Sequence, residues 1–433
     1  MPKSQQSSSR RRQPSASSTS RSSTSRSHIV ILWILLAVIA LWMTLKYLPA
    51  SADRHRPLPE VIALIPLLIV PIVLLLALAA VLRLWPQCVM AIVLLVVQLL
   101  WQAAYIMPMP AAVTTMLGIP RQSVATTTAT TTVTTSTTSA SATTVDDGAD
   151  AASTTSPSMP SGSQSSTPSQ ASRTIRVMTL NTRYGRADTG TIMHLVKQER
   201  IDLLAVQEVN DDLIHRLEVS HIDDELPYRV LGKSRPDDNA GSNALFMRFE
   251  PMDFSDESVN ISAAAAPVAR VRLGSQIVEF ASVHPKSPPR SGQDWSDGVR
   301  ALGRFAIRAD KCNAAGAASG TTNNVKLPTD ANGIPKQYST AAHCAAVVLG
   351  DLNSSVYHPS FRDALRQGSG LADSSLELHR GWNNTFPASW PTFPALIEID
   401  HVLHTSGIVA KSAHSAKIPR TDHRALIVEL EIE

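Results

Sequence analysis

Several short apolar segments in the second half of the chain stop at a polar residue that could take part in catalysis. These residues are carboxylates, amides and imidazoles: Asn181, Glu208, His284, Asp351 with Asn353, Asp400 with His401, and Asp422 with His423. If the segments are strands of common sheets, their ends meet at one edge and bring these groups together. Such a cluster is typical of a site where a metal ion assists hydrolysis.

A turn is the simpler explanation for some of these residues. Asn and Asp are common turn formers, so any one of them at a strand end is equally compatible with a turn alone. Glu208 and His284 are not turn formers, and six polar endings in one domain are hard to explain by turns. We therefore interpret the set as a candidate active site.

The motifs around these residues follow one another in the order of a known family. They are LNT at 180–182, QE at 207–208, VH at 283–284, GDLN at 350–353, IDHV at 399–402 and TDH at 421–423. This string resembles the endonuclease/exonuclease/phosphatase superfamily, which includes DNase I-like nucleases, neutral sphingomyelinases and inositol polyphosphate phosphatases. The resemblance covers essentially all of 174–433, and the membrane-anchored arrangement resembles that of bacterial members of the family. It implies an α/β fold, a four-layer β-sandwich in which two packed sheets are flanked by helices.

The resemblance also implies a metal site. Glu208 is expected to bind Mg²⁺ or Mn²⁺, because these hard cations prefer carboxylate oxygen and keep several waters. Asn181 is expected beside the metal, where it would hold a metal-bound water or Asp351. Asp422 is expected to offer a second carboxylate to the metal.

The remaining residues receive catalytic roles from the same resemblance. Asp351 is expected to orient and deprotonate the attacking water, and Asn353 to donate to the phosphoryl oxygens or to fix Asp351. His423 is expected to contact the phosphate, and Asp400 to hold the His423 ring and favour its protonated form. His284 is expected to supply a second imidazole contact to the phosphate or the leaving group.

Two neighbours of these motifs call for different interpretations. His401 follows Asp400 directly and should face the other side of the strand, so we interpret it as structural. Glu398 occupies a position where many relatives have a basic residue, which removes one possible phosphate contact.

The elements that would position these side chains can be predicted from apolar patterning. Strands should end at Asn181, Glu208, His284 and Asp351, and later strands should cover 399–404, 408–412 and 424–431. Helices are expected over 189–199, 296–309 and 360–367. We expect residues 174–433 to form one catalytic domain.

The first part of the chain predicts attachment to a membrane. Residues 1–27 are rich in Ser and basic residues and should be disordered. A transmembrane region over 28–108 follows, with three apolar runs at 29–45, 61–82 and 89–106, each near the roughly 20 residues that cross a bilayer. The predicted lipid partner is therefore a bilayer that holds three helices.

Basic residues near the helix ends predict the orientation. With the basic tail inside, three crossings place the catalytic domain on the extracytoplasmic side of the cell membrane. Residues 109–173 form a Ser/Thr-rich linker typical of glycosylated stalks. Cys312 and Cys344 bracket a polar insertion, and a disulfide and two free thiols are equally compatible with the sequence.

Charge limits the choice of substrate. Residues 1–173 carry 12 basic and 5 acidic residues, whereas residues 174–433 carry 27 and 31, so the predicted catalytic domain is acidic. This average does not indicate a strongly basic nucleic-acid-binding face. The leading hypothesis is a phosphodiesterase or nuclease whose phosphoester substrate (nucleic acid, lipid head group or inositol phosphate) is undetermined. The alternatives are a sphingomyelinase-like phospholipid head-group hydrolase and an inactive surface binding module, and no protein partner is predicted.

Overall fold

The computed structural model describes residues 20–108, 173–233, 235, 241–318, 343–381, 383–389 and 393–433. The predicted linker, apart from its last residue, and the insertion over 319–342 lie outside these residues. So does the predicted tail up to residue 19. Helix α1 (Ser20–Thr44) begins inside the segment predicted as the tail, because the helix extends beyond its apolar run.

Two six-stranded sheets form the centre of the described part of 173–433. The first has the order β11 (Ile408–Lys417), β12 (Arg424–Ile432), β1 (Arg173–Asn181), β2 (Leu203–Val209), β4 (Ser242–Met247) and β3 (Tyr228–Leu231). The second has the order β5 (Asp253–Ser255), β6 (Val268–Leu273), β7 (Gln276–Ser282), β8 (His343–Asp351), β10 (Asp400–His404) and β9 (Ala372–Asp373). Both sheets are mixed, with β1–β2 and β7–β8 as parallel pairs.

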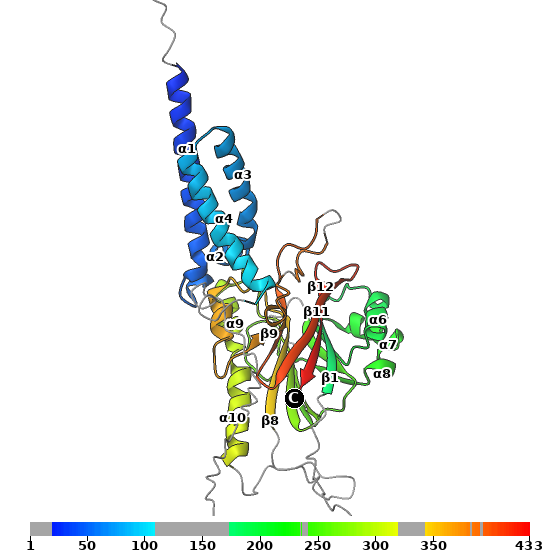
Figure 1. Cartoon of the computed structure of the whole chain (residues 1–433). Helices are drawn as coiled ribbons and strands as arrows, with labels where there is room; N and C mark the ends of the chain where they lie inside the picture. Colours follow the sequence, from blue (N-terminus) through cyan, green and yellow to red (C-terminus); the bar gives the residue numbers. More distant parts are fainter. Residues whose placement is uncertain are drawn as a thin grey trace, which may run out of the picture.

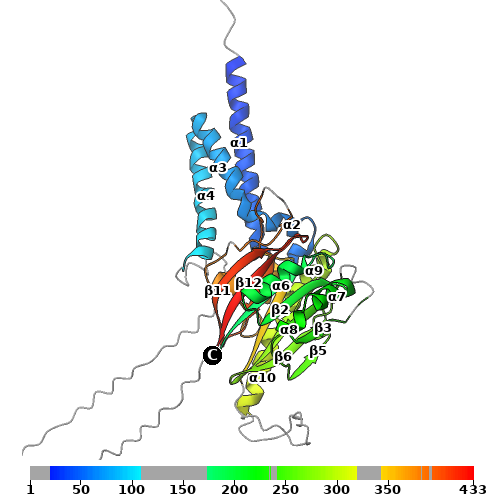
Figure 2. The same cartoon turned by 90° about the vertical axis from the view of Figure 1, so that its right-hand side faces the viewer.

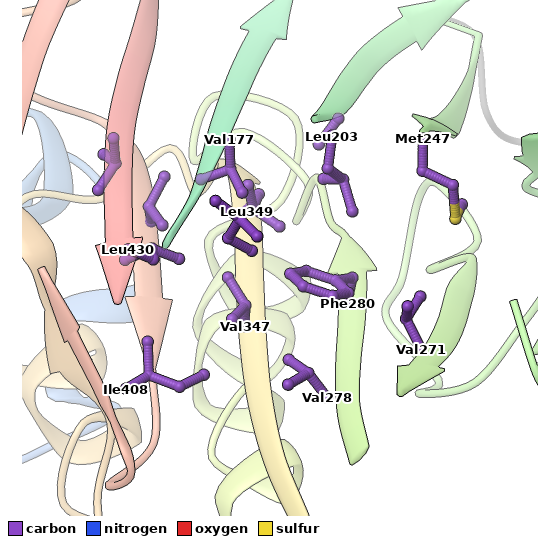
Figure 3. Close-up of a cluster of buried hydrophobic side chains, with 14 of the residues drawn as sticks. Val177, Leu203, Met247, Val271, Val278, Phe280, Val347, Leu349, Ile408 and Leu430 are labelled. Carbon is purple, nitrogen blue, oxygen red and sulfur yellow. The ribbon is translucent and has the colours of Figure 1, made fainter. Parts of the chain in front are cut away.

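The sheets pack face to face and carry helices on their outer faces (Figures 1 and 2). Val177, Phe280 and Leu349 belong to the apolar layer between the sheets (Figure 3). The first sheet is covered by α6 (Thr189–Gln198), α7 (Asp211–Val219) and the short α8 (Ile222–Glu225). The second is covered by α9 (Gly292–Ala301), α10 (Arg304–Ala318) and α11 (Pro359–Ala364). The predicted α/β sandwich is therefore confirmed.

Strand β8 shows how the sequence produces this layering. Its residues 345–349 are all apolar and buried. Val347 and Leu349 point into the layer between the sheets, whereas Ala346 and Val348 pack under the helices. A strand buried on both faces is expected to be an unbroken apolar run. The alternation also fixes the direction of Asp351, which continues the inter-sheet side of the strand.

The two cysteines that bracket the insertion are bonded to each other. Cys312 of α10 and Cys344 of β8 are joined by a disulfide, with 6.0 Å between their Cα atoms. The bond closes the base of the insertion and ties the outer helix to the sheet.

The second of the three predicted membrane-spanning helices is not continuous in the structure. Among the described residues, two helices are long and apolar enough to cross a membrane, Arg26–Tyr47 and Trp85–Ala103. The second predicted run is divided into α2 (Leu58–Ala63), a 3₁₀ turn (Ile65–Leu68) and α3 (Ile69–Val81). Pro66 lies within the 3₁₀ turn, where its ring cannot supply a helical N–H. Three spanning helices are therefore not confirmed, although α1, α3 and α4 (Trp85–Ile106) lie side by side (Figure 1).

These helices rest directly on the α/β domain through buried polar contacts. Asp53, in the loop after α1, accepts hydrogen bonds from the backbone N–H (2.9 Å) and hydroxyl (2.5 Å) of Ser360. Arg362 donates to the carbonyl oxygen of Lys46. Nε2 of His358 lies 2.9 Å from the carbonyl oxygen of Pro59. The domain thus lies against the ends of its own helices.

Candidate active site

The predicted site residues gather where strands end at one edge of the inter-sheet layer. Asn181 is the last residue of β1 and Asp351 the last residue of β8. Asp400 begins β10 and is paired directly with Asp351 in the antiparallel ladder. His284 and His423 lie in the loops after β7 and before β12, and both side chains are buried. Both sheets therefore contribute to one cluster.

The side-chain amide of Asn181 links the two sheets. Its nitrogen donates to Glu208 at 3.0 Å and to Asp351 at 2.9 Å, and its oxygen accepts from the backbone N–H of Arg183. Asn181 therefore positions the two carboxylates, and since its oxygen keeps a second lone pair, a contact with a metal or a metal-bound water stays a prediction. Thr421 donates to the backbone carbonyl of Asn181 and fixes the end of β1.

Glu208 reaches the cluster through an irregularity in β2. The pairing of β2 with β4 shifts register between Val206 and Val209, and Glu208 adopts a left-handed φ of 57°. Such a bulge redirects a side chain that regular alternation would send elsewhere. The backbone N–H of Tyr184 donates to the second carboxylate oxygen of Glu208 at 2.8 Å.

His423 forms the cationic centre of the cluster. Its Nδ1 lies 2.8 Å from Asp400 and its Nε2 lies 3.6 Å from Asp351. Burial alone would lower the pKa of His423, but the carboxylates of Asp400 and Asp351 outweigh burial and raise it to about 10. The imidazole is therefore protonated at neutral pH, and both of its nitrogens carry hydrogen.

His284 approaches Asp351 from the loop after β7. Its Nε2 lies 3.4 Å from Asp351 and 4.0 Å from Glu208. Burial opposes its charge, yet Asp351 and Glu208 raise the pKa of His284 above the usual value. Burial alone would raise the pKa of Asp351. The imidazoles of His423 and His284 outweigh burial and hold this pKa far below its usual range. The two groups thus keep Asp351 ionised.

The GDLN motif shapes the loop that holds Asp351. The backbone N–H of Asn353 donates to Asp351 at 2.8 Å, while its side-chain nitrogen donates to the carbonyl of Pro285 at 3.1 Å. A Cβ on Gly350 would lie 1.9 Å from the carbonyl oxygen of Val283, so only glycine fits there. In this conformation Asn353 fixes Asp351, which is one of its two predicted roles.

The carboxylate of Asp422 has different contacts from that of Glu208. Its carboxylate lies 3.5 Å from Arg183 and is 28% exposed, at the rim of the cluster. Its negative charge contributes to the raised pKa of His423. A role for Asp422 in holding a metal stays a prediction.

Sequence reasoning missed Tyr184 and Thr385, which support the cluster, whereas Phe386 belongs to the aromatic segment 385–394, for which the sequence leaves cleft lining and simple packing equally open. The hydroxyl oxygen of Thr385 accepts from the backbone N–H of Asp400 at 3.3 Å, and the ring of Phe386 lies 5.0 Å from that of His423. The backbone N–H of Tyr184 holds Glu208, as described above. Thr385 and Phe386 lie in an irregular segment without a periodic pattern, so strand alternation does not reveal which side they face.

The two neighbours of the motifs behave as interpreted. His401 is buried on the other side of β10, where its nitrogens contact Asp373 at 2.6 Å and the carbonyl of Ser354 at 2.8 Å. Glu398 accepts a hydrogen bond from the hydroxyl of Ser375 and contacts no catalytic side chain at hydrogen-bond distance. Burial, followed by repulsion from Asp373, raises the pKa of Glu398 to about 8.

The donor set fits a hard cation at Glu208 better than at His423. Asp351, Asp400 and His423 place ligand atoms within 4.8 Å of one another. However, a protonated imidazole offers no lone pair, so this group is an ion-pair network. Glu208 is 14% exposed, and each of its oxygens accepts one N–H and keeps a second lone pair. Carboxylate oxygen next to solvent is the environment that Mg²⁺ and Mn²⁺ prefer.

Comparison with known proteins agrees with this geometry. A model of the endonuclease/exonuclease/phosphatase family matches residues 178–423, so the chain belongs to this family. Members of the family are generally phosphoester hydrolases that use divalent metals.

Solved structures provide further similarities. A Bacteroides vulgatus endonuclease/exonuclease/phosphatase is 18% identical, with a TM-score of 0.41 over 60% of this chain and 100% of that chain. A Bacteroides thetaiotaomicron family protein is 16% identical, with a TM-score of 0.40 over 60% and 99%. A D. rerio TDP2 humanized by 14 mutations is 10% identical, with a TM-score of 0.43 over 59% and 98%. No curated protein matches the chain.

Proposed function

We propose that the protein is a membrane-anchored, divalent-metal-dependent phosphodiesterase. The observation that carries this proposal is the amide of Asn181, which joins Glu208 of one sheet to Asp351 of the other. Two buried imidazoles, His284 and His423, face the same Asp351. These contacts support a proposed cation site, an ionised carboxylate and positive charge around one small volume.

In the proposed reaction, Asp351 orients a water and accepts its proton as the water oxygen bonds to phosphorus. The bond from phosphorus to the leaving oxygen then breaks. His423, held as a cation by Asp400, donates to a phosphoryl oxygen and stabilises its growing negative charge. His284 donates to a second oxygen of the phosphate or to the leaving group.

The metal would lie at Glu208, with Asp422 as a further carboxylate at the rim. A bound Mg²⁺ or Mn²⁺ would neutralise the phosphate and the charge that develops on the leaving oxygen. Asn181 and the backbone N–H of Tyr184 would keep the Glu208 carboxylate oriented toward it.

We infer that the N-terminal helices anchor the enzyme with its catalytic domain outside the cytoplasm. Helices α1 and α4 are long enough to span, and the segment 58–81 would complete the third crossing despite its break. The basic tail and Arg83 would lie on the side opposite to the catalytic domain, in agreement with the distribution of basic residues in membrane proteins. The Cys312–Cys344 disulfide fits an oxidising compartment.

A second candidate, hydrolysis of a phospholipid head group, is favoured by one observation. Asp53, Pro59 and Tyr105 contact the catalytic domain directly at the ends of the helices. A domain held there would lie at the membrane surface, so lipid head groups would be within its reach.

The test is a panel of substrates on the full chain in nanodiscs, with Mg²⁺, Mn²⁺ or EDTA. It compares plasmid DNA, RNA, sphingomyelin, inositol phosphates and an aryl phosphodiester. We expect metal-dependent cleavage of at least one substrate and its loss in Asp351→Asn. If no substrate is cleaved, the hydrolase proposal fails and the inactive binding module is favoured. If a substrate is cleaved equally well by Asp351→Asn, the role proposed for Asp351 fails.

A further inference from the structure

A pocket of about 590 Å³ lies between the helices and the catalytic domain, outside the catalytic cluster. Pro66, Leu67 and Ile69 form its wall on the helix side. Residues 394–398 line the pocket on the side of the α/β domain, and Tyr105 of α4 also lines it. Pockets of this size hold small organic ligands.

One segment separates this pocket from the catalytic residues. Asn384 and Ile397 line the pocket, whereas Thr385 and Phe386 between them contact Asp400 and His423. The pocket and the active site therefore share a wall, although none of the predicted catalytic or metal-binding residues lines the pocket.

The polar end of the pocket carries Arg424. Its guanidinium donates to the hydroxyl and the carbonyl oxygen of Ser415, both at 2.9 Å. No acidic partner of Arg424 is found among the ion pairs of the described residues. Burial lowers the pKa of Arg424, because its charge is partly withdrawn from water. A half-buried cation held only by neutral oxygens favours an anionic ligand.

The other titratable groups in the wall do not compete strongly for Arg424. The carboxyl of Glu398 has a pKa of about 8, so it is largely protonated at neutral pH. His401 is already bonded to Asp373 and Ser354. The wall on the helix side is apolar apart from Gln102 and continues into α3, whose residues Val70 and Leu74 are exposed on the outer surface.

We propose that this pocket binds an acyl chain of an anionic phospholipid from the surrounding bilayer, with the lipid phosphate against Arg424. The apolar wall on the helix side matches the chain, and the guanidinium matches the head group. The proposal rests on the membrane insertion proposed above, but it does not depend on the proposed hydrolysis. The lipid would stabilise the contact between helices and catalytic domain whether or not it is cleaved.

The test uses the full chain in nanodiscs that contain either phosphatidylglycerol or phosphatidylcholine with a photoreactive diazirine in the acyl chain. After irradiation and proteolysis, labelled peptides are mapped by mass spectrometry. We expect labelling of 394–398 by phosphatidylglycerol to exceed that by phosphatidylcholine about tenfold, the ratio that one charge-assisted hydrogen bond can supply. Labelling at the exposed Leu74 should be equal for the two lipids and serves as an internal reference.

Two variants separate the apolar and the anionic parts of the proposal. Leu67→Trp fills the pocket and should remove the label from 394–398, whereas Leu74→Trp on the outer surface should not. Arg424→Gln should reduce phosphatidylglycerol labelling to the phosphatidylcholine level, whereas Arg200→Gln, an exposed cation outside the pocket lining, should not. Thermal unfolding of each variant checks that it is folded.

Three results would overturn the proposal. The first is label on α3 with none on 394–398, since the pocket would then hold no chain. The second is equal labelling by the two lipids, and the third is an unchanged preference in Arg424→Gln. Because no turnover is measured, failure here leaves the proposed hydrolysis standing, and an inactive enzyme leaves the lipid site standing.

Discussion

The two faces of strand β10 carry similar histidine–aspartate pairs in different surroundings. On the side toward the catalytic cluster, His423 lies 2.8 Å from Asp400. On the side toward the helices, His401 lies 2.6 Å from Asp373. All four side chains are buried, and although burial opposes both charges, the carboxylates raise the pKa of His423 to about 10 and that of His401 to about 9.

The pairs differ in what the second imidazole nitrogen contacts. Nε2 of His401 lies 2.8 Å from the carbonyl oxygen of Ser354, so both nitrogens are used within the protein. Nε2 of His423 faces Asp351 at 3.6 Å, which is too long for a hydrogen bond. His423 therefore keeps a donor for a substrate oxygen, whereas His401 has none to offer. An Asp–His pair alone does not indicate catalysis.

The largest expected difference between the faces is in turnover. We expect His423→Gln to lower kcat/KM about 10³-fold, because a cationic donor to the phosphate is lost. His401→Gln should keep the wild-type order of magnitude. Both variants are assayed in nanodiscs on the substrate that the panel identifies, with folding checked by circular dichroism. Equal losses in the two variants would show that His401 also acts in catalysis.

Substitution of the carboxylates Asp400 and Asp373 should change turnover in the same unequal way as substitution of their histidines, but by a smaller factor. Asp400→Asn removes the charge that keeps His423 protonated, and we expect kcat to fall about 10²-fold. Asp373→Asn should lower the unfolding temperature while leaving kcat nearly unchanged. The measurements are steady-state kinetics and thermal unfolding of each variant. A normal kcat in Asp400→Asn would remove the positioning role from Asp400.

The contrast was partly predictable from sequence, because strand alternation places residues 400 and 401 on opposite sides. Asn181 and Asp351 were likewise found as the polar ends of apolar strands. The orientation of Glu208 depends on a bulge, which no periodic pattern reveals. The helix expected over 296–309 is divided into α9 and α10 near Gly303, where a Cβ would meet Gln367. The contact of Asp53 with Ser360 joins residues far apart in sequence, and a single sequence does not encode such pairing visibly.

Stability should depend on pH through the helix-facing pair. His401 titrates near 6.5 when unfolded and near 9 when folded, so the folded state holds its proton more tightly. The stabilisation is complete below pH 6.5 and is lost as the pH rises to about 9, a difference on the order of 3 kcal/mol. We expect the unfolding temperature in EDTA to fall over this window in the wild type.

Two variants isolate the contribution of His401 to this pH dependence. Glu398 and His423 also have raised pKa values and act in the same direction, so the wild-type slope is a sum. His401→Gln should flatten part of the slope between pH 6.5 and 9. His194→Gln, at an exposed position, should leave the slope unchanged. An identical slope in His401→Gln would mean that its proton is not linked to folding.

The smallest expected effect concerns the contact between the helices and the catalytic domain. Asp53 accepts two hydrogen bonds from Ser360, on the helix-facing side of the molecule. Asp53→Asn keeps the shape but replaces one acceptor oxygen by a donor, which should cost about 1–2 kcal/mol of stability. The free energy of unfolding of the full chain measures this cost. Asp212→Asn, an exposed carboxylate paired with Arg216, is the matched control and should change stability by less than about 0.5 kcal/mol. Because Asp53 lies on the helix-facing side, kcat should stay unchanged; a fall in kcat would show that the helices also position the catalytic face.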